Sequence, residues 1–360
     1  MKKSIIAFLS ILCSLFLFIS CTTPELKINE PQISELASLP QADGYDLFSI
    51  GMLNDNTPII ILGTGKEDNL KKIYKVNIDG INKLIFEGEG RGSFYAIYIK
   101  SHPNNTYSIQ FENESALIFD TATDRIIKTI DFGQVEGTFF SISNSGDRLL
   151  YSNAGGLYVT DLDFQNKIKI YTPKDLSTGA RWPSFSNDDS KIAFSIGEPL
   201  TMQKCLYDFS TGEIITIDYN SYYTFWPKNS DGFIACDDAF VRESDNDIHA
   251  SFKYFNLKGD EINAVNISTG IYPIRATEDY MVYYQNVQTI QRLTETGFRD
   301  CKIKLWNFKS GELKALDIGY QIQEIWSYQA SNEGNKLLMF MTVVIDGKAV
   351  SKVLWVDLGG

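Results

Sequence analysis

The chain has 360 residues, and its 45 acidic residues outnumber its 33 basic ones, which gives a formal net charge of −12. No extended basic run interrupts this acidity, so the sequence argues against nucleic acid as a partner and against broad electrostatic docking on an anionic membrane. The acidity mainly favours solubility, and an aromatic share of 13% with 26 glycines suits short strands joined by tight turns.

The first 20 residues have the layout of a secretory signal peptide. Lys2 and Lys3 precede a largely apolar run over residues 5–19, which is too short for a comfortable membrane span. The ending Ile19-Ser20-Cys21 resembles a bacterial lipobox. This resemblance implies that Cys21 carries acyl chains such as palmitate and becomes the mature N-terminus. An ordinary signal peptide or an uncleaved anchor helix is the alternative.

The segment after Cys21 bears on where a lipoprotein would reside. Thr22 stands where an inner-membrane retention signal would have Asp, so we expect an outer-membrane destination, on the periplasmic or the surface face. Two or three acyl chains hold a protein on a membrane stably. We therefore expect a signal peptide over residues 1–20, a lipid attachment and tether over 21–30, and a single domain over 31–360.

A strand-like segment that ends in Asp or Asn and continues into a turn recurs seven times, at separations of 41 to 51 residues. The repeated positions are Asn77, Asp120, Asp161, Asp208, Asn256, Asn307 and Asp357. A repeat of this length made only of short strands predicts an all-β fold, a seven-bladed β-propeller of four-stranded antiparallel blades. Because the seventh copy ends near the C-terminus, we expect residues 33–39 to supply its last strand. Six blades plus a separate sheet is the alternative.

A second repeated phrase marks the turn between the first two strands of a blade, a and b. In residues 182–194, strand a ends at Phe185, residues 186–190 form a polar turn, and strand b begins at Lys191. Similar phrases stand at 141–151 and 330–340. They resemble the Ser-Pro-Asp-Gly-Lys repeat of TolB-like, WD-repeat-like bacterial propellers, with Asn in place of Pro. The resemblance implies a periplasmic or surface propeller that binds proteins, peptides or glycans, although some relatives are parts of peptidases or polysaccharide lyases.

Cysteines and acidic clusters give no metal or redox pattern. Cys205, Cys236 and Cys301 read as small buried hydrophobic residues, although a bridge between Cys205 and Cys236 on neighbouring blades stays open. Asp245 and Asp247 offer oxygen ligands at alternating spacing, but no Gly follows at the bend of an EF-type loop, so a solvated charge run is favoured. We expect no cofactor and no metal.

Ligand-binding candidates come from the loops that surround the channel of a propeller. Two connections between strands b and c are long and adjacent, over residues 237–249 and 285–300, and extra loop length is often functional. Aromatic and basic residues also recur before strand a. The candidates are Arg181, Trp182, Tyr222, Trp226, Asp237, Asp238, Arg242, Glu243, His249, Arg292, Arg299 and Asp300.

Catalytic signals are sparse. The chain has only two histidines, His102 and His249, which are too few for a multi-histidine metal site, and it has no Gly-x-Ser-x-Gly motif. The leading hypothesis is a membrane-anchored, non-catalytic propeller that binds a protein, peptide or glycan. The alternative is a carbohydrate-active enzyme with paired carboxylates at the channel mouth.

Overall fold

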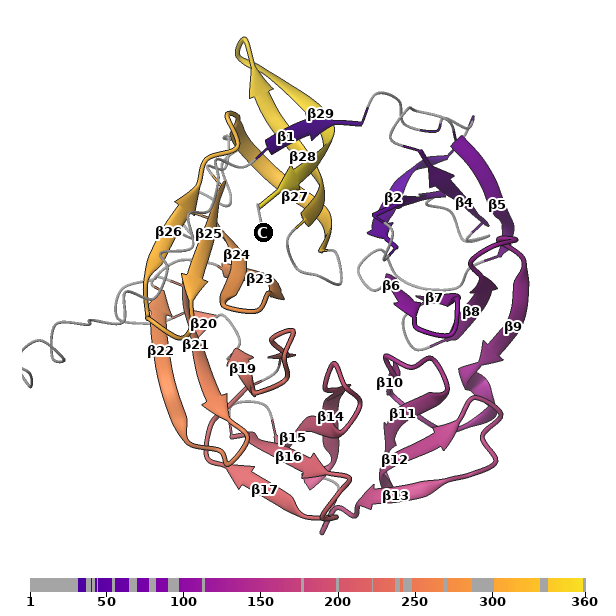
Figure 1. The fold of residues 1–360 in the computed structure, drawn as a ribbon, viewed down its shortest axis with the longest axis vertical. Helices are drawn as coiled ribbons and strands as arrows, with labels where there is room; N and C mark the ends of the chain where they lie inside the picture. The colour runs from indigo at the N-terminus through magenta and orange to yellow at the C-terminus, as the bar shows by residue number, and fades with distance from the viewer. Residues whose placement is uncertain are drawn as a thin grey trace, which may run out of the picture.

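The computed structural model describes residues 32–36, 40, 43, 45–53, 56–64, 70–77, 82–89, 97–111, 114–175, 178–198, 201–221, 223–236, 240–241, 248–267, 271–286, 301–330 and 336–358. These residues form 29 strands and one short 3-10 helix, η1 (Phe132–Gln134). The strands are arranged as a ring of blades around a central opening (Figure 1). The described part of the chain contains no helix that is long and apolar enough to cross a membrane. The all-β propeller fold is as predicted.

The first four blades are separate four-stranded antiparallel sheets. Blade one consists of β2 (Asp46–Met52), β3 (Pro58–Gly63), β4 (Leu70–Val76) and β5 (Asn82–Glu89). Blade two consists of β6 (Ile97–His102), β7 (Thr106–Phe111), β8 (Ser115–Asp120) and β9 (Ile126–Asp131). Blade three consists of β10 (Phe139–Ile142), β11 (Arg148–Asn153), β12 (Gly156–Asp161) and β13 (Ile168–Tyr171). Blade four consists of β14 (Ala180–Phe185), β15 (Lys191–Ile196), β16 (Gln203–Asp208) and β17 (Ile214–Ile217).

The remaining blades depart slightly from this plan. Blade five has β18 (Tyr223–Phe225), β19 (Gly232–Cys236), β21 (Ile248–Asn256) and β22 (Glu261–Ile267), with the short β20 (Phe240–Val241) also paired to β21. Blade six has β23 (Ile271–Ala276), β24 (Tyr280–Asn286), β25 (Cys301–Asn307) and β26 (Leu313–Leu316). Blade seven has β27 (Gln321–Ala330), β28 (Lys336–Ile345), β29 (Lys348–Asp357) and β1 (Gln32–Glu35). A single pairing, Cys301 with Ile322, joins blades six and seven into one sheet.

The ring closes through the N-terminal strand. β1 pairs antiparallel with β29, in the register Gln32 opposite Asp357 and Glu35 opposite Leu354 (Figure 1). The predicted donor, residues 33–39, is therefore confirmed in its first part. This pairing covers the free edge of β29, which would otherwise be open to other chains.

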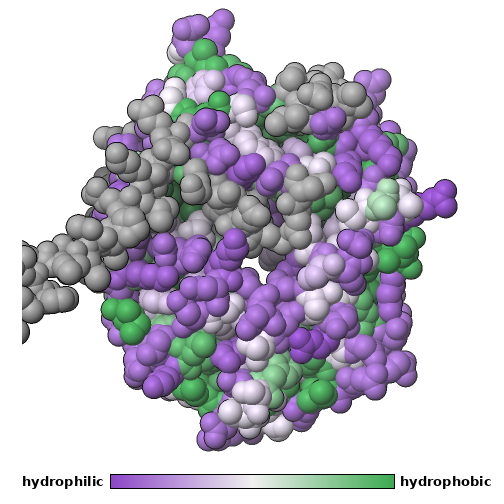
Figure 2. Space-filling view, in the orientation of Figure 1, coloured by the Kyte–Doolittle hydropathy of each residue, from purple (hydrophilic) through white to green (hydrophobic). Residues whose placement is uncertain are grey.

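The core consists of seven apolar clusters, each formed by two neighbouring blades of the described chain. One cluster joins the last blade to the first, where Leu338 and Val353 meet Ile50 and Ile60. The second strands β3, β7 and β19 are buried along their whole length, because a blade covers each of their faces. Outermost strands are exposed, and Leu84, Ile127, Ile168, Ile262 and Leu313 reach solvent at the outer edge, where Figure 2 shows hydrophobic side chains.

The repeated Asp or Asn builds the turn between strands c and d. The side chains of Asp120, Asp208 and Asn256 accept hydrogen bonds from backbone N–H groups two or three residues ahead, at 2.8 to 2.9 Å. Asp161 and Asn307 do the same. Such Asx turns need a short side chain with an acceptor oxygen, which explains the residue types in the repeat.

The turns between strands a and b of blades three, four and five form a belt in which each of these turns bonds to the next blade. Asn144 and Ser145 of blade three donate to Asp189 of blade four, and the Asn187 amide donates to the carbonyl of Pro227 in blade five at 2.7 Å. Asn thus stands at the Pro position of the related repeat because its side chain links two blades. We call this end of the blades, which carries the a-to-b and c-to-d turns, the turn face, and the opposite end the loop face.

One glycine of this belt has no tolerated replacement. Gly146 adopts a φ of +76°, and a Cβ atom there would lie 2.6 Å from Cγ of the His102 ring. His102 itself is buried between blades two and three, with Nδ1 3.1 Å from the carbonyl of Asn144 and Nε2 2.9 Å from the hydroxyl of Ser108. Because a carbonyl only accepts, Nδ1 carries the proton and Nε2 accepts from Ser108. Burial lowers the pKa of His102 to about 4, so the ring is neutral and structural.

Candidate functional site

Most of the predicted ligand residues lie outside the described part of the chain. These ligand-binding candidates are Tyr222, Asp237, Asp238, Arg242, Glu243, Arg292, Arg299 and Asp300. The lipid-attachment residue Cys21 and the acids Asp245 and Asp247 also lie outside the described residues. The expected loop of residues 237–249 is in part a strand pair, which corrects its boundaries. Phe240 pairs with His249, so His249 belongs to β21 rather than to a loop, and Gln285 likewise lies in β24.

Arg181 and Trp182 lie at the start of β14, close to the loop face. The register between β14 and β15 shifts between Arg181 and Ser184, and Trp182 adopts a φ of +45° at this bulge. The bulge turns the half-buried indole toward Phe139 of blade three, with ring centroids 5.3 Å apart. The Arg181 guanidinium lies 3.7 Å from the carboxylate of Glu198, which belongs to the loop after β15. The three residues Arg181, Trp182 and Glu198 are called the loop-face group below.

Trp226 has a different environment from Trp182. Its ring is only 7% exposed and packs against Phe233 in the cluster between blades four and five. Its indole N–H donates to the hydroxyl of Ser184 at 3.1 Å. Trp226 therefore joins two blades, and we do not include it in a binding surface.

A buried lysine lies between the same two blades. Lys204 of β16 is fully buried, and its ammonium group donates to the hydroxyl of Ser195 at 2.8 Å. Ser195 in turn donates to the carbonyl of Ser221 at 2.6 Å. Burial lowers the pKa of Lys204 to about 7, against the opposing influence of the Cys205 and Cys236 thiols. The three described cysteines are buried and none forms a disulfide, so the Cys205–Cys236 bridge is not present.

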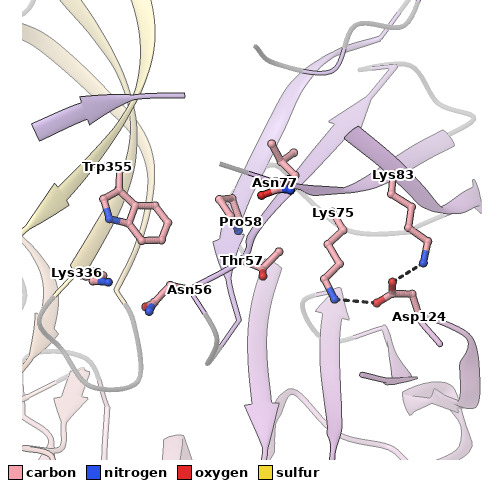
Figure 3. A pocket seen from close by; sticks show the side chains of 10 residues that line it. Asn56, Thr57, Pro58, Lys75, Asn77, Lys83, Asp124, Lys336 and Trp355 are labelled. Atoms are coloured by element: carbon pink, nitrogen blue, oxygen red, sulfur yellow. Dashed lines mark hydrogen bonds and ion pairs between the residues drawn. The ribbon is translucent and has the colours of Figure 1, made fainter. Parts of the chain in front are cut away.

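A pocket of about 680 Å³ opens on the turn face at the junction of blades seven, one and two. Blade seven contributes Lys336 and Trp355, blade one contributes most of the remaining wall, and blade two contributes Asp124 (Figure 3). The residues that line it are Asn56, Thr57, Pro58, Lys75, Val76, Asn77, Lys83, Asp124, Lys336 and Trp355.

Asp124 links blade two to blade one across this pocket. Its carboxylate accepts from the ammonium groups of Lys75 at 3.1 Å and of Lys83 at 2.6 Å (Figure 3). Burial raises the pKa of Asp124, but the hydrogen bonds from Lys83 and Lys75 and the charges of these lysines outweigh it, so the pKa lies below its usual range. Asp124 is therefore ionised at neutral pH.

The residue repeat contains a signal for this pocket that our sequence reasoning missed. Lys75 and Trp355 each stand two residues before a repeated position, Asn77 and Asp357, so their side chains leave the same face of strand c in their blades. Lys83, Asp124 and Lys336 come from separate repeats, and only ring closure brings them together. Among the described residues, no three His, Cys, Asp or Glu side chains gather in a way that suits a metal ion.

Comparison with known proteins supports the fold. No protein family and no curated protein matches the sequence. The structure is similar to that of the tricorn protease, with a TM-score of 0.53 and 11% identity over 87% of this chain, and it spans 35% of the tricorn protease chain. A chain from a mitotic checkpoint complex matches with a TM-score of 0.49 and 13% identity, over 91% of this chain and 95% of its own. At 11% identity the similarity to the tricorn protease shows the propeller fold alone.

Proposed function

We propose that this chain is a lipid-anchored bacterial envelope protein whose propeller binds a partner protein on the loop face. The propeller fold suggests a protein-interaction module. The lipid anchor at Cys21 and an outer-membrane address are our inferences from the N-terminal sequence. A peptide or glycan is the alternative form of ligand.

The observation that carries the proposal is the direction of β1. Strand β1 begins opposite Asp357, which is the turn-face end of β29, and runs toward the loop face. A tether over residues 21–30 would therefore join the propeller at its turn face. An acyl group on Cys21 would hold this face near the membrane and leave the loop face directed away from it.

The loop-face group then has the exposure that a docking surface needs. The side chains of Arg181 and Glu198 are 28% and 56% exposed, and Trp182 is half-buried beside them. Exposed aromatic and arginine residues are frequent anchors of protein interfaces. The last residues of β19 and β24, Cys236 and Asn286, lie at the same end of the neighbouring blades five and six. A partner on the loop face would therefore be placed to contact three blades.

The anchor is tested by replacing the acceptor of the lipid. We expect Cys21→Ala in the full-length chain to move the protein from the membrane fraction to the soluble fraction, because a single acyl-bearing residue provides the attachment. Cys205→Ala is the control, because Cys205 is buried in the propeller. Retention of the Cys21→Ala protein on membranes would instead indicate an uncleaved anchor helix.

The binding face is tested by position-specific photo-cross-linking in cells. A photoreactive residue at Arg181 samples the loop face, and one at the exposed Thr211 samples the turn face of the same blade. We expect a protein adduct from position 181 that is absent at position 211. The adduct should disappear when Arg242, Glu243, Arg292 and Arg299 are changed to Ala. Equal adducts at both positions would refute loop-face binding.

A further inference from the structure

The pocket on the turn face has an excess of positive charge in an acidic protein. Lys75, Lys83 and Lys336 contribute three ammonium groups, and Asp124 is the single acid among the described lining residues. Even when Asp357 is included, whose carboxylate lies 4.0 Å from Lys336, cations outnumber anions. The chain as a whole has a net charge of −12, so this local excess runs against its composition.

The ion pairs between Asp124 and the two lysines Lys75 and Lys83 do not account for all of this positive charge. One ionised carboxylate is neutralised by one ammonium group, and Asp124 receives two. The side chain of Lys83 is 59% exposed and that of Lys336 is 25% exposed, so both can reach a molecule in the cavity without losing their own solvation entirely.

The opposite wall is suited to the organic part of a ligand. The Trp355 indole lies beside Lys336, whose ammonium group is 5.8 Å from the ring centroid (Figure 3). Asn56, Thr57 and Asn77 add amide and hydroxyl groups along the floor between the two walls. A cavity of about 680 Å³ with an apolar wall and a few polar groups matches the sites that hold small organic molecules.

We propose that this pocket binds a phosphate group carried by a small organic molecule. Three ammonium groups against the one carboxylate of Asp124 leave a surplus of two positive charges among the described lining residues. A phosphate monoester carries about two negative charges at neutral pH and a carboxylate carries one, so this surplus favours phosphate. The phosphate would lie against Lys336 and the organic part against the neighbouring Trp355 indole. Lys83 on the facing wall adds to the positive potential of the cavity.

This phosphate could come from a soluble sugar phosphate or from a lipid headgroup. Gln32 lies opposite Asp357 in β1 and β29, and Asp357 lies opposite Lys336 in β29 and β28. The N-terminal end of β1 is thus one strand away from the pocket wall. The proposal does not depend on acylation of Cys21, and its failure would leave the proposed anchor and partner untouched.

The test is direct binding to the full-length chain in an uncharged detergent, at low ionic strength. Calorimetry would use glucose 6-phosphate and inorganic phosphate, and co-sedimentation would use vesicles of phosphatidylcholine with or without phosphatidylglycerol. We expect saturable binding of at least one phosphate probe, weakened roughly tenfold in Lys83→Gln with Lys336→Gln. Binding of glucose 6-phosphate identifies a soluble source, and binding only to phosphatidylglycerol vesicles identifies a lipid source.

The control variant is Lys128→Gln. Lys128 is also a half-exposed lysine paired with an aspartate, Asp163, but it lies outside the pocket. Circular dichroism would establish that both variants keep the wild-type melting temperature, and Lys336→Gln alone would be used if the double variant does not. The proposal is overturned if no phosphate probe binds, or if the pocket and control variants lose affinity equally.

Discussion

Asp189 and Asp124 are two buried aspartates on the turn face with opposite surroundings. Their side chains are 6% and 7% exposed, and each bridges neighbouring blades. Asp189 accepts from the backbone N–H groups of Asn144 and Ser145, both at 2.7 Å, and from both of their side chains. Asp124 instead accepts mainly from two lysine ammonium groups, with the hydroxyl of Tyr107 at 3.4 Å. Backbone donors of a turn hold the first carboxylate, and charged side chains hold the second.

This difference separates a structural site from a site with spare binding capacity. Two donors to Asp189 are backbone N–H groups that the turn fixes in place, and its side-chain donors, Asn144 and Ser145, are short and belong to the same turn. The carboxylate of Asp189 is therefore committed to the belt. Ammonium groups on four-carbon stems can reorient toward a second anion with little rearrangement. The same residue type therefore locks the belt in blades three and four and leaves a surplus of charge at the closure of the ring.

The largest change in stability is expected from a substitution in the belt of a-to-b turns. Asp189→Asn keeps the shape and the tolerance for the φ of +57° at this position, but it places an NH₂ group opposite donors. We expect a loss of about 3 kcal/mol in the free energy of unfolding, because buried N–H groups lose a charged acceptor. Urea unfolding measures it, with Asp147→Asn at a 67% exposed side chain as the control. Equal, small losses would show that the belt contributes little.

Lys204 extends the comparison to a buried base whose ammonium group donates to a hydroxyl. Its pKa in the folded state is about 7, well below the 10.5 of the unfolded chain. Between these values the unfolded state binds more protons, so stability rises with pH. Below about pH 7 both the folded and the unfolded state carry the proton, so the pH dependence of stability from Lys204 ends there.

We therefore expect the free energy of unfolding to gain about 2 kcal/mol between pH 7 and pH 9 from Lys204. Lys204→Met should remove this gain, because the thioether side chain has a similar length and no proton to lose. The measurement is urea unfolding of both proteins at the two pH values. The control substitution is Lys128→Met, because Lys128 forms an ion pair with Asp163 at the surface. An identical pH dependence in the two proteins would mean that Lys204 stays charged in the fold.

The sequence predicts features that repeat and misses features that depend on ring closure. The propeller follows from the Asp or Asn repeat, the closing strand near residue 33 from the missing last strand of the seventh copy, and the turn between Phe185 and Lys191 from a phrase that recurs in three blades. The pocket does not, because Lys83 and Lys336 are 253 positions apart and line one pocket only when blade seven packs on blade one. Trp226 was expected to bind a ligand because it is aromatic, but aromatic residues also fill blade junctions, and the sequence does not distinguish these roles.

Asp124→Asn should separate stability from binding at the ring closure. We expect a loss of about 1 kcal/mol in stability, smaller than at Asp189, because Lys75 and Lys83 can turn toward solvent. The net charge of the pocket rises by one, so glucose 6-phosphate or phosphatidylglycerol vesicles should bind roughly threefold more tightly. Parallel urea unfolding and binding measurements test both arms. Weaker binding would show that Asp124 positions the lysines rather than competing for them.

The smallest expected effect is on a single turn between strands c and d. The side-chain oxygen of Asn256 accepts from the backbone N–H groups of Lys258 at 2.9 Å and Asp260 at 3.0 Å. Asn256→Ala removes this acceptor at an exposed turn, where water can replace it, so we expect a loss of about 0.5 kcal/mol. Asn256→Asp, made together with Asp260→Asn because the Asn256 amide donates to the Asp260 carboxylate at 2.9 Å, should restore stability, since a carboxylate accepts equally well. Urea unfolding of the two variants is decisive: similar losses for Ala and Asp would mean that the repeated residue acts through something other than its acceptor oxygen.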